Sequence, residues 1–194
     1  LMPEQSPKVK GWDIWLFTRS ANDVGGDLLD FIQVDENKFG IAVGDVAGKC
    51  LSAALLMAKL QSTIRALVYD FLSLESLGNK LNMIFHRDSP SKIFASLIYA
   101  EINSESGDIK FINAGHYPPI IARKGKVEQL DKNAPALGLI KEAAFNKQLI
   151  SLEQNDFMII YSDGLTEAKN ESGEFFGEAK LIELLKSRQM MTSQ

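Results

Sequence analysis

Three aspartates in this chain of 194 residues stand in similar local surroundings that suit metal binding. Asp27 follows two glycines and precedes an apolar run, in VGGDLLD. Asp45 comes at the end of an apolar run in AVGDVAG, and Asp163 at the end of another in IIYSDGLTE. An acid at a strand end is held rigidly, and an adjacent glycine lets main-chain carbonyls approach a shared ion. The pattern suggests three carboxylates that hold metal if their strand ends meet.

Each aspartate taken alone also has a simpler explanation, because Asp and Gly are common turn residues. The rest of the composition restricts the kind of metal site. One cysteine and two histidines, His86 and His116, are too few for a zinc site built from Cys or His. His116 itself, in the turn NAGHYPP, is better explained as fixing that turn than as a catalytic group. Metal ligands would therefore be mostly carboxylates, which select hard ions such as Mg²⁺ or Mn²⁺.

The segment GIAVGDVAGKCLSAALLMAK, residues 40–59, could instead be a phosphate-binding loop between a strand and a helix. A Walker loop needs the pattern G-x-x-x-x-G-K-[ST]. Here its first glycine would be Val43, and its hydroxyl residue, after Lys49, would be Cys50. The carboxylate of Asp45 would also oppose the phosphate that main-chain N–H groups of such a loop attract. The direct phosphate interpretation therefore fails, and the metal interpretation of this loop is preferred.

Composition and charge argue against several classes of function. The formal net charge is −4, from 21 basic and 25 acidic residues, so we expect no nucleic-acid partner. No apolar run approaches the roughly 18 residues of a membrane-spanning helix, so we expect no membrane insertion. A single cysteine cannot form an internal disulfide, which favours a reducing, cytoplasmic compartment. The length and the 45% hydrophobic content fit one domain over residues 1–194.

The elements that would position the three aspartates follow from the apolar periodicity. Alternation and turn signals predict strands, including two hairpins, and helical spacing predicts helices. Strands mostly adjoin strands, which indicates antiparallel rather than parallel sheets. The expected fold class is an α/β (α+β) sandwich of two mainly antiparallel β-sheets packed together and flanked by α-helices. The expected strands cover residues 12–19, 30–34, 39–43, 94–102, 108–114, 118–123, 127–130, 145–152 and 157–161, and the expected helices 51–70, 74–85 and 177–188.

Five segments carry motifs that follow one another in a fixed order along the chain. They are VGGDLLDF (24–31), GDVAGKCLSAALLMA (44–58), FASLIYAEI (94–102), INAGHYPP (112–119) and YSDGLTEAKNESGEFFGEAKL (161–181). In this order they resemble the PPM (PP2C-like) serine/threonine phosphatases, specifically the bacterial SpoIIE/RsbU branch. Several spaced motifs in the right order are far more specific than any one alone.

The resemblance implies a two-metal active site. Asp45 would bridge two Mn²⁺ or Mg²⁺ ions, with the carbonyl oxygen of Val46 as a further ligand. Asp27 would serve one ion, directly or through water, and Asp163 the other. A water molecule between the ions would lose a proton and attack a phosphoserine or phosphothreonine in line, without a phosphoenzyme intermediate. Asp27, Asp45 and Asp163 are therefore the expected catalytic residues.

The same resemblance implies partners. The natural substrate would be a phosphorylated STAS-type anti-sigma-factor antagonist in a bacterial stress or developmental switch. Domains of this branch usually follow an N-terminal sensor or linker. A homodimer formed through such a region, which the sequence from Leu1 onward lacks, is a further expectation.

The sequence departs from the family pattern in two places. Cys50 stands where the family has a second glycine before the helix. Family domains also continue to a strand with an Asp pair, DDiT, which the sequence to Gln194 lacks. Either the chain is truncated or its second metal site is incomplete, and we expect weaker metal binding and weak hydrolysis. A catalytically silent, partner-binding pseudophosphatase therefore stays an alternative. A nucleotidyl cyclase, suggested by GGDLLDF, is disfavoured because Leu28 and Leu29 replace the required Glu and Phe.

Overall fold

The computed structural model describes residues 3, 5–18, 25–48, 50–90, 92–123 and 126–192, with the backbone alone for Cys50 and residues 188–192. The chain forms two compact units. The first comprises Leu1–His116 and Asn133–Ser151, and the second comprises Tyr117–Lys132 and Leu152–Gln194. The single domain expected over residues 1–194 stays a prediction.

The first unit contains a five-stranded antiparallel sheet in the order β1-β2-β3-β4-β7. Short turns join β1 to β2 and β3 to β4, whereas the connection from β2 to β3 carries two helices. Within the described part of the chain, β1 is an outer strand, paired along one side only. The strands are β1 (Asp27–Gln33), β2 (Lys38–Val46), β3 (Ala95–Asn103), β4 (Asp108–Ala114) and β7 (Gln148–Ser151).

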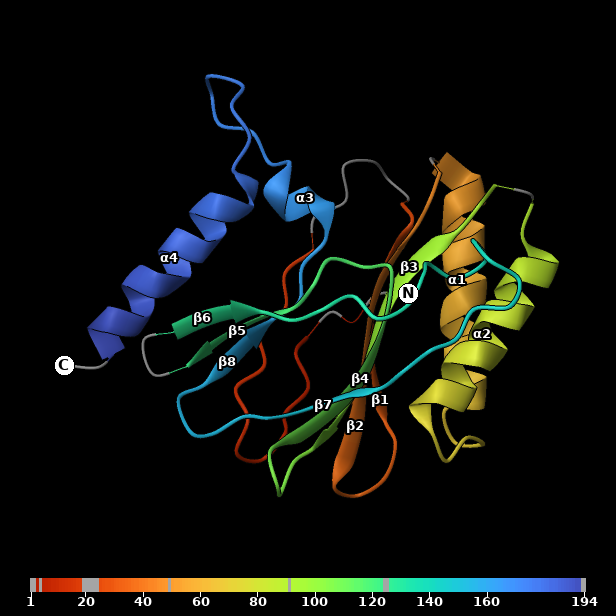
Figure 1. Ribbon diagram of the computed structural model, residues 1–194, viewed down its shortest axis with the longest axis horizontal. Coiled ribbons are helices and arrows are strands. Elements are labelled where there is room, and N and C mark those ends of the chain that lie inside the picture. Colours follow the sequence, from red (N-terminus) through yellow and green to blue (C-terminus); the bar gives the residue numbers. More distant parts are fainter. Residues whose placement is uncertain are drawn as a thin grey trace. The chain divides into compact units, whose positions relative to one another are not determined.

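Two helices, α1 (Cys50–Leu67) and α2 (Leu74–Asp88), cover one face of this sheet (Figure 1). Both bury residues three or four positions apart, so each presents an apolar stripe to the strands. Ser73 caps α2, because its side-chain oxygen accepts the N–H of Ser76 at 3.1 Å. The core between helices and sheet includes Leu28, Ile32, Ala42, Val46, Ala53, Met57, Leu60, Ile64, Leu77, Leu81, Phe85, Leu97, Tyr99 and Ile112.

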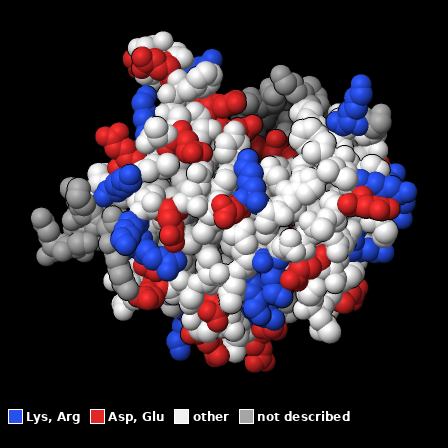
Figure 2. Space-filling view, in the orientation of Figure 1, with Lys and Arg blue, Asp and Glu red and all other residues white. Residues whose placement is uncertain are grey.

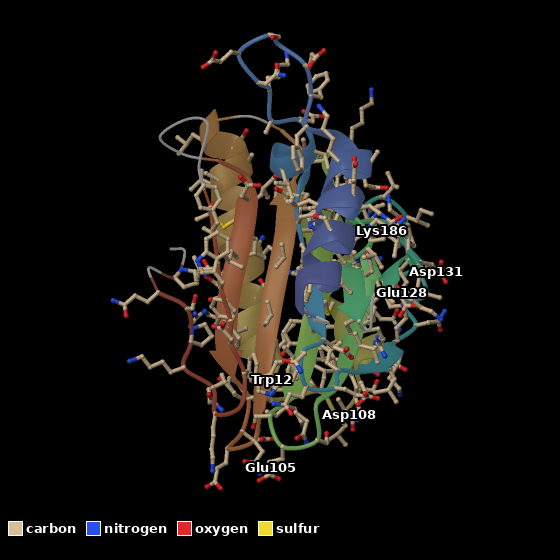
Figure 3. The ribbon with its side chains drawn as sticks, turned by 90° about the vertical axis from the view of Figure 1, so that its left-hand side faces the viewer. Trp12, Glu105, Asp108, Glu128, Asp131 and Lys186 are labelled. Atoms are coloured by element: carbon tan, nitrogen blue, oxygen red, sulfur yellow. The ribbon has the colours of Figure 1, made fainter. Side chains whose placement is uncertain are left out.

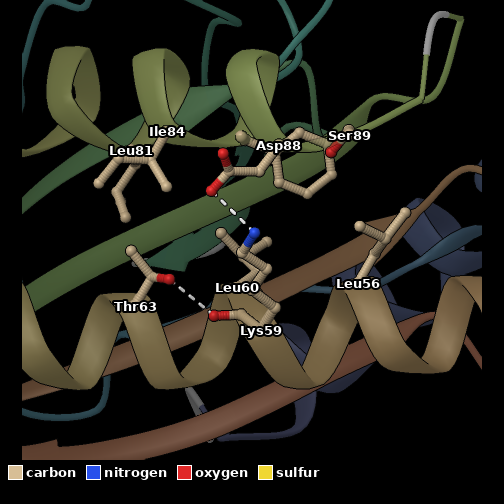
Figure 4. A pocket seen from close by; sticks show the side chains of 9 residues that line it. Leu56, Lys59, Leu60, Thr63, Leu81, Ile84, Asp88 and Ser89 are labelled. Atoms are coloured by element: carbon tan, nitrogen blue, oxygen red, sulfur yellow. Dashed lines mark hydrogen bonds and ion pairs between the residues drawn. The ribbon is translucent and has the colours of Figure 1, made fainter.

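An ion pair joins α1 to α2 at the surface. Lys59 Nζ lies 2.7 Å from Asp88 Oδ2, beside a small hollow lined mainly by apolar side chains of both helices (Figure 4). Arg87 Nε also donates to Asp88, at 2.5 Å. The hydrogen bonds from Arg87 and Lys59 hold the pKa of the Asp88 carboxyl far below its usual value. An ion pair therefore connects the two helices beside their apolar contact.

The second unit contains a three-stranded antiparallel sheet in the order β6-β5-β8, together with two helices. Its core gathers around Ile120, Tyr161, Leu181 and Leu185. The Tyr161 hydroxyl donates to Glu178 Oε2 at 3.0 Å, and burial together with this bond raises the pKa of Tyr161 to about 12. The elements are β5 (Ile120–Arg123), β6 (Lys126–Gln129), β8 (Phe157–Ile159), α3 (Asp163–Thr166) and α4 (Gly177–Thr192).

The structure confirms the expected fold class, because two antiparallel sheets are accompanied by helices in an α+β arrangement. Both predicted hairpins form, as β3–β4 and β5–β6. All three predicted helices are present, although α1 ends at Leu67 and α2 continues to Asp88. The sequence does not indicate α3, because a helix of four residues is too short to show a period.

The strand predicted at residues 12–19 is wrong for residues 13–18, which form no strand. An alternating pattern needs a neighbouring strand to pair with, and this segment has none among the described residues. Trp15 and Phe17 are 81% and 68% exposed, and their rings stack with centroids 6.0 Å apart. Residue 19 lies outside the described residues.

Trp12 attaches the N-terminal segment to one end of the five-stranded sheet. Its ring packs edge-on against Phe39, and its Nε1 donates to the carbonyl oxygen of Ser104 at 3.3 Å. Figure 3 shows Trp12 at the end of the unit where Glu105 and Asp108, beside the β3–β4 turn, also lie. Trp12 packs near the start of β2, whereas Asp27, the first residue of β1, pairs with Asp45 near the end of β2. Trp12 and the two aspartates therefore lie at opposite ends of the sheet.

The surface carries both signs of charge. On the face shown in Figure 2, basic and acidic side chains are interspersed. Among the described residues, no helix has both the length and the apolar content needed to cross a bilayer.

A substitution at Gly78 would test how closely α2 packs in the first unit. A Cβ atom there would lie 2.8 Å from Phe145 Cγ and 3.0 Å from Ile112 Cδ1. We expect Gly78→Ala to lower the free energy of unfolding by about 1–3 kcal/mol, because overpacking outweighs the better helix propensity of alanine. Asn79→Ala, on the exposed side of α2, is the control and should change stability little. Urea denaturation compares them, and a Gly78→Ala protein as stable as wild type contradicts this packing.

Candidate metal site

Asp27 and Asp45 lie directly opposite each other on neighbouring antiparallel strands. Asp27 is the first residue of β1, and its register partner Asp45 is the last but one of β2. Opposite residues point to the same face of a sheet, with Cβ atoms roughly 5 Å apart. Their neighbours Leu28 and Val46 are buried in the core under the helices, so both carboxylates lie on the other face. The structure brings these two aspartates together, and their role as ligands stays a prediction.

Gly26 leaves space beside this pair of aspartates. A Cβ atom on Gly26 would lie 2.6 Å from the carbonyl oxygen of Val46 and 2.9 Å from Oδ1 of Asp45. The two oxygen atoms therefore border the same small space. The N–H of Val46 donates to the Gly26 carbonyl oxygen at 3.1 Å, which fixes this close approach. Any side chain at position 26 would fill the place where the two oxygens converge.

Ser96 and His116 extend the polar groups beside Asp45. Ser96 of β3 is the register partner of Asp45 on the other side of β2. Its hydroxyl oxygen lies 2.8 Å from His116 Nδ1 and 3.5 Å from the main-chain carbonyl oxygen of Asp45. His116 is 2% exposed, and its main-chain N–H donates to Asn113 Oδ1 at 2.8 Å. Groups behind a ligand orient it, so Ser96 and His116 support the end of β2 that carries Asp45.

The sequence gives only a weak sign of this support. His116 is expected to fix its turn, and its burial and its bond to Asn113 fit that role. Ser96 in FASLIYAEI is not distinguished from an ordinary strand residue. The one feature of the sequence that could have pointed to Ser96 is its position near the start of a buried strand, where a small polar residue needs a hydrogen-bond partner. Lys49, considered above as a phosphate-loop lysine, lies outside the described residues.

Asp163 belongs to the second unit, where it is the first residue of α3. Its main-chain carbonyl oxygen accepts the N–H of Glu167 at 2.7 Å and the hydroxyl of Thr166 at 3.2 Å, which closes the single helical turn. The residue is exposed, and the chain reaches it from Tyr161, which is anchored in the core of the unit. Asp163 is therefore presented at the surface of its unit, and the meeting of all three aspartates stays a prediction.

The donor atoms gathered in the first unit are all oxygens, from two carboxylates and one main-chain carbonyl. Oxygen donors suit Mg²⁺ and Mn²⁺, so the residues present fit the expected ions. Like charges directly opposite each other on paired strands repel, and a divalent cation would relieve that repulsion. Among the residues that the structure describes, no three Asp, Glu, His or Cys side chains form a complete cluster. The first unit thus brings together oxygen atoms that could form part of a ligand set, and their role as ligands stays a prediction.

Comparison with known proteins identifies the family. Residues 35–194 match the family described as Stage II sporulation protein E (SpoIIE). The chain belongs to the SpoIIE family. The phosphoserine phosphatase RsbU of Bacillus subtilis (strain 168) is 24% identical over 196 residues, covering 100% of this SpoIIE-family chain and 58% of RsbU. The chain spans between 33% and 58% of the length of three curated relatives that it matches.

Solved structures share the fold of this SpoIIE-family chain. The RsbU and RsbW domains of a Mycobacterium tuberculosis protein align with a TM-score of 0.73 at 22% identity, covering 88% of this chain and 48% of that one. The PP2C phosphatase domain of SpoIIE from Bacillus subtilis aligns with a TM-score of 0.67 at 18% identity, covering 88% and 55%. The fold is that of PP2C-type phosphatase domains, which the motifs predict.

Replacing Gly26 tests whether the space beside Asp45 and Val46 binds metal. We expect Gly26→Ala to weaken Mn²⁺ binding about tenfold or more, because its methyl group would displace the two oxygens that border this space. Gly25→Ala is the matched control, since a Cβ atom there would have the main-chain nitrogen of Asp27, at 4.0 Å, as its nearest described neighbour beyond the adjoining residues. Electron paramagnetic resonance of free Mn²⁺ gives both affinities. Equal affinities in the two variants contradict this placement.

Proposed function

We propose that this chain is a metal-dependent protein phosphatase that hydrolyses phosphoserine and phosphothreonine. The observation that carries the proposal is the pair Asp27 and Asp45, directly opposite on β1 and β2, with the Val46 carbonyl oxygen beside it. Membership of the SpoIIE family supports the same activity, because the relative RsbU is named a phosphoserine phosphatase.

Asp27, Asp45 and the carbonyl oxygen of Val46 would hold Mn²⁺ or Mg²⁺ from the first unit, and Asp163 would contribute from the second. Two such ions, when bound, supply a nucleophilic water at neutral pH and stabilise charge on the phosphoryl oxygens. A cysteine nucleophile is not needed. Cys50 has Leu56 six positions on, where a cysteine-dependent phosphatase needs arginine.

The contribution of the protein itself is to hold charged oxygens in fixed positions. The β1–β2 ladder fixes Asp27 opposite Asp45, so that the two carboxylates need little reorganisation when a ligand arrives. The Ser96 hydroxyl, held by His116, supports the main chain at Asp45 from the other side of β2. A site built on strands in this way is more rigid than one built on loops.

We further propose that the substrate is a phosphorylated STAS-type anti-sigma-factor antagonist. The support is the resemblance of the motifs to the RsbU branch and the match to RsbU over the whole chain. Two ions are part of the same proposal for a domain that also carries the C-terminal Asp-bearing strand of the family, and Asp45 would contribute to holding both.

The decisive variant is Asp45→Asn, which keeps the shape of the side chain and removes its charge. We expect Mn²⁺-dependent hydrolysis of a phosphoserine peptide to fall by about a hundredfold or more, the scale of losing a main electrostatic stabiliser. Thermal stability without metal should stay close to that of wild type, because the substitution keeps the shape of the side chain. Phosphate release and the unfolding temperature are measured on the same samples.

Asp70→Asn, at an exposed aspartate just beyond α1, is the control and should hydrolyse the peptide like wild type. If the wild-type chain hydrolyses the peptide and Asp45→Asn hydrolyses it equally fast, the proposed site is wrong. A wild-type chain that binds Mn²⁺ but hydrolyses neither the peptide nor p-nitrophenyl phosphate is instead the partner-binding pseudophosphatase.

A further inference from the structure

A buried carboxylate on β1 is tied to helix α1. Asp30 is 1% exposed, and Arg65 donates to both of its oxygens, from Nε to Oδ2 at 2.7 Å and from Nη2 to Oδ1 at 2.6 Å. The N–H of Phe31 donates to Oδ1 at 3.0 Å as well. The hydrogen bonds to Asp30 raise the pKa of Arg65. This two-bond fork between a strand and a helix has directional geometry that a single point charge lacks.

A second contact ties the same strand to the same end of the helix. The hydroxyl of Tyr69, two residues beyond α1, donates to the carbonyl oxygen of Gln33 at 3.0 Å. Helix α1 lies against β1 and β2 (Figure 1). The strand that begins with Asp27 is therefore fastened to the helix at its middle and at its far end.

The register of β1 decides where Asp27 points. Successive residues of a strand face opposite sides, so Asp27 and Asp30, three positions apart, lie on opposite faces. A slip of one residue would turn Asp27 toward the helices and Asp30 away from them. As an outer strand, β1 is held by a ladder along one side only within the described residues. In the register that places Asp27 opposite Asp45, Asp30 faces α1 and Arg65 donates to its carboxylate.

We propose that Arg65 is a positioning residue of the metal site, because its fork on Asp30 fixes the register of β1 and thereby keeps Asp27 opposite Asp45. The inference rests on the proposed function, in which these two aspartates hold metal. It assigns Arg65 no contact with metal or substrate. Its influence reaches the opposite face of the sheet through the position of the strand alone.

The chain contains a matched pair for comparison. Arg87 on α2 makes a similar fork on Asp88, from Nε at 2.5 Å and from Nη2 at 2.9 Å. The Arg87 side chain is 68% exposed, and both partners of this fork belong to α2. Arg87→Gln therefore removes the same kind of interaction without touching β1.

The test compares Arg65→Gln, Arg65→Lys, the double variant Asp30→Leu/Arg65→Met and Arg87→Gln. Mn²⁺ affinity is measured by electron paramagnetic resonance, β1 amide exchange by NMR, and stability by thermal unfolding. We expect Arg65→Gln to weaken Mn²⁺ binding about tenfold or more and Arg65→Lys to weaken it less, because lysine keeps the charge and loses the fork. Arg87→Gln should bind like wild type.

The double variant separates positioning from stability. Replacing an ion pair by apolar residues of similar size often leaves stability unchanged or raises it. We therefore expect near wild-type unfolding temperature, together with weaker Mn²⁺ binding and faster β1 amide exchange. Wild-type affinity in Arg65→Gln and in the double variant overturns the inference. A wild-type chain that binds no Mn²⁺ overturns the proposed function. In that case amide exchange of β1 is compared between metal-free wild type and metal-free Arg65→Gln. Equal exchange rates overturn the effect of the fork on the strand as well.

Discussion

The pairing of β1 with β2 is the constraint on which the candidate site depends. It sets two carboxylates, Asp27 and Asp45, directly opposite each other, an arrangement that costs free energy unless something neutralises it. The ladder holds them because the neighbours of both aspartates, Leu28 and Val46, are anchored in the core under the helices. Burial on one face of the sheet thus fixes the positions of two like-charged side chains on the other.

The end of β2 is held from both sides. Val46 donates its N–H to Gly26, and Ala47 donates its own to Phe94 at 2.8 Å. Ser96 adds its hydroxyl on the β3 side. These main-chain bonds fix the strand end that carries Asp45, and the chain turns into α1 only after them. The candidate ligands are therefore held by backbone hydrogen bonds, which side-chain motion does not disturb.

The sequence alone identifies the aspartates but not what holds them. Acids next to glycine at the ends of apolar runs are visible in one dimension, which is why Asp27 and Asp45 could be expected to lie close together, as could the antiparallel α+β fold. Both aspartates lie inside their strands, although the predicted strands begin and end short of them, because Gly and Asp are poor strand formers by propensity. The contacts of Ser96 and Arg65 join segments far apart in the chain, so they depend on register and cannot be seen in a local pattern.

The buried charge of Asp30 is hard to explain by stability. Removing a carboxylate from water is costly, and an ion pair in such a place is seldom more stabilising than apolar residues that fill the same volume. The ion pair instead specifies which face of β1 turns toward α1, because Asp30 can reach Arg65 from one face of β1 only. An apolar residue at this position would also favour the core side of β1, but it would have no single partner to reach, whereas a buried carboxylate turned away from its arginine would lose its partner. The cost of that loss disfavours the wrong register, and the strand that carries Asp27 keeps its place because of a charge on its opposite face.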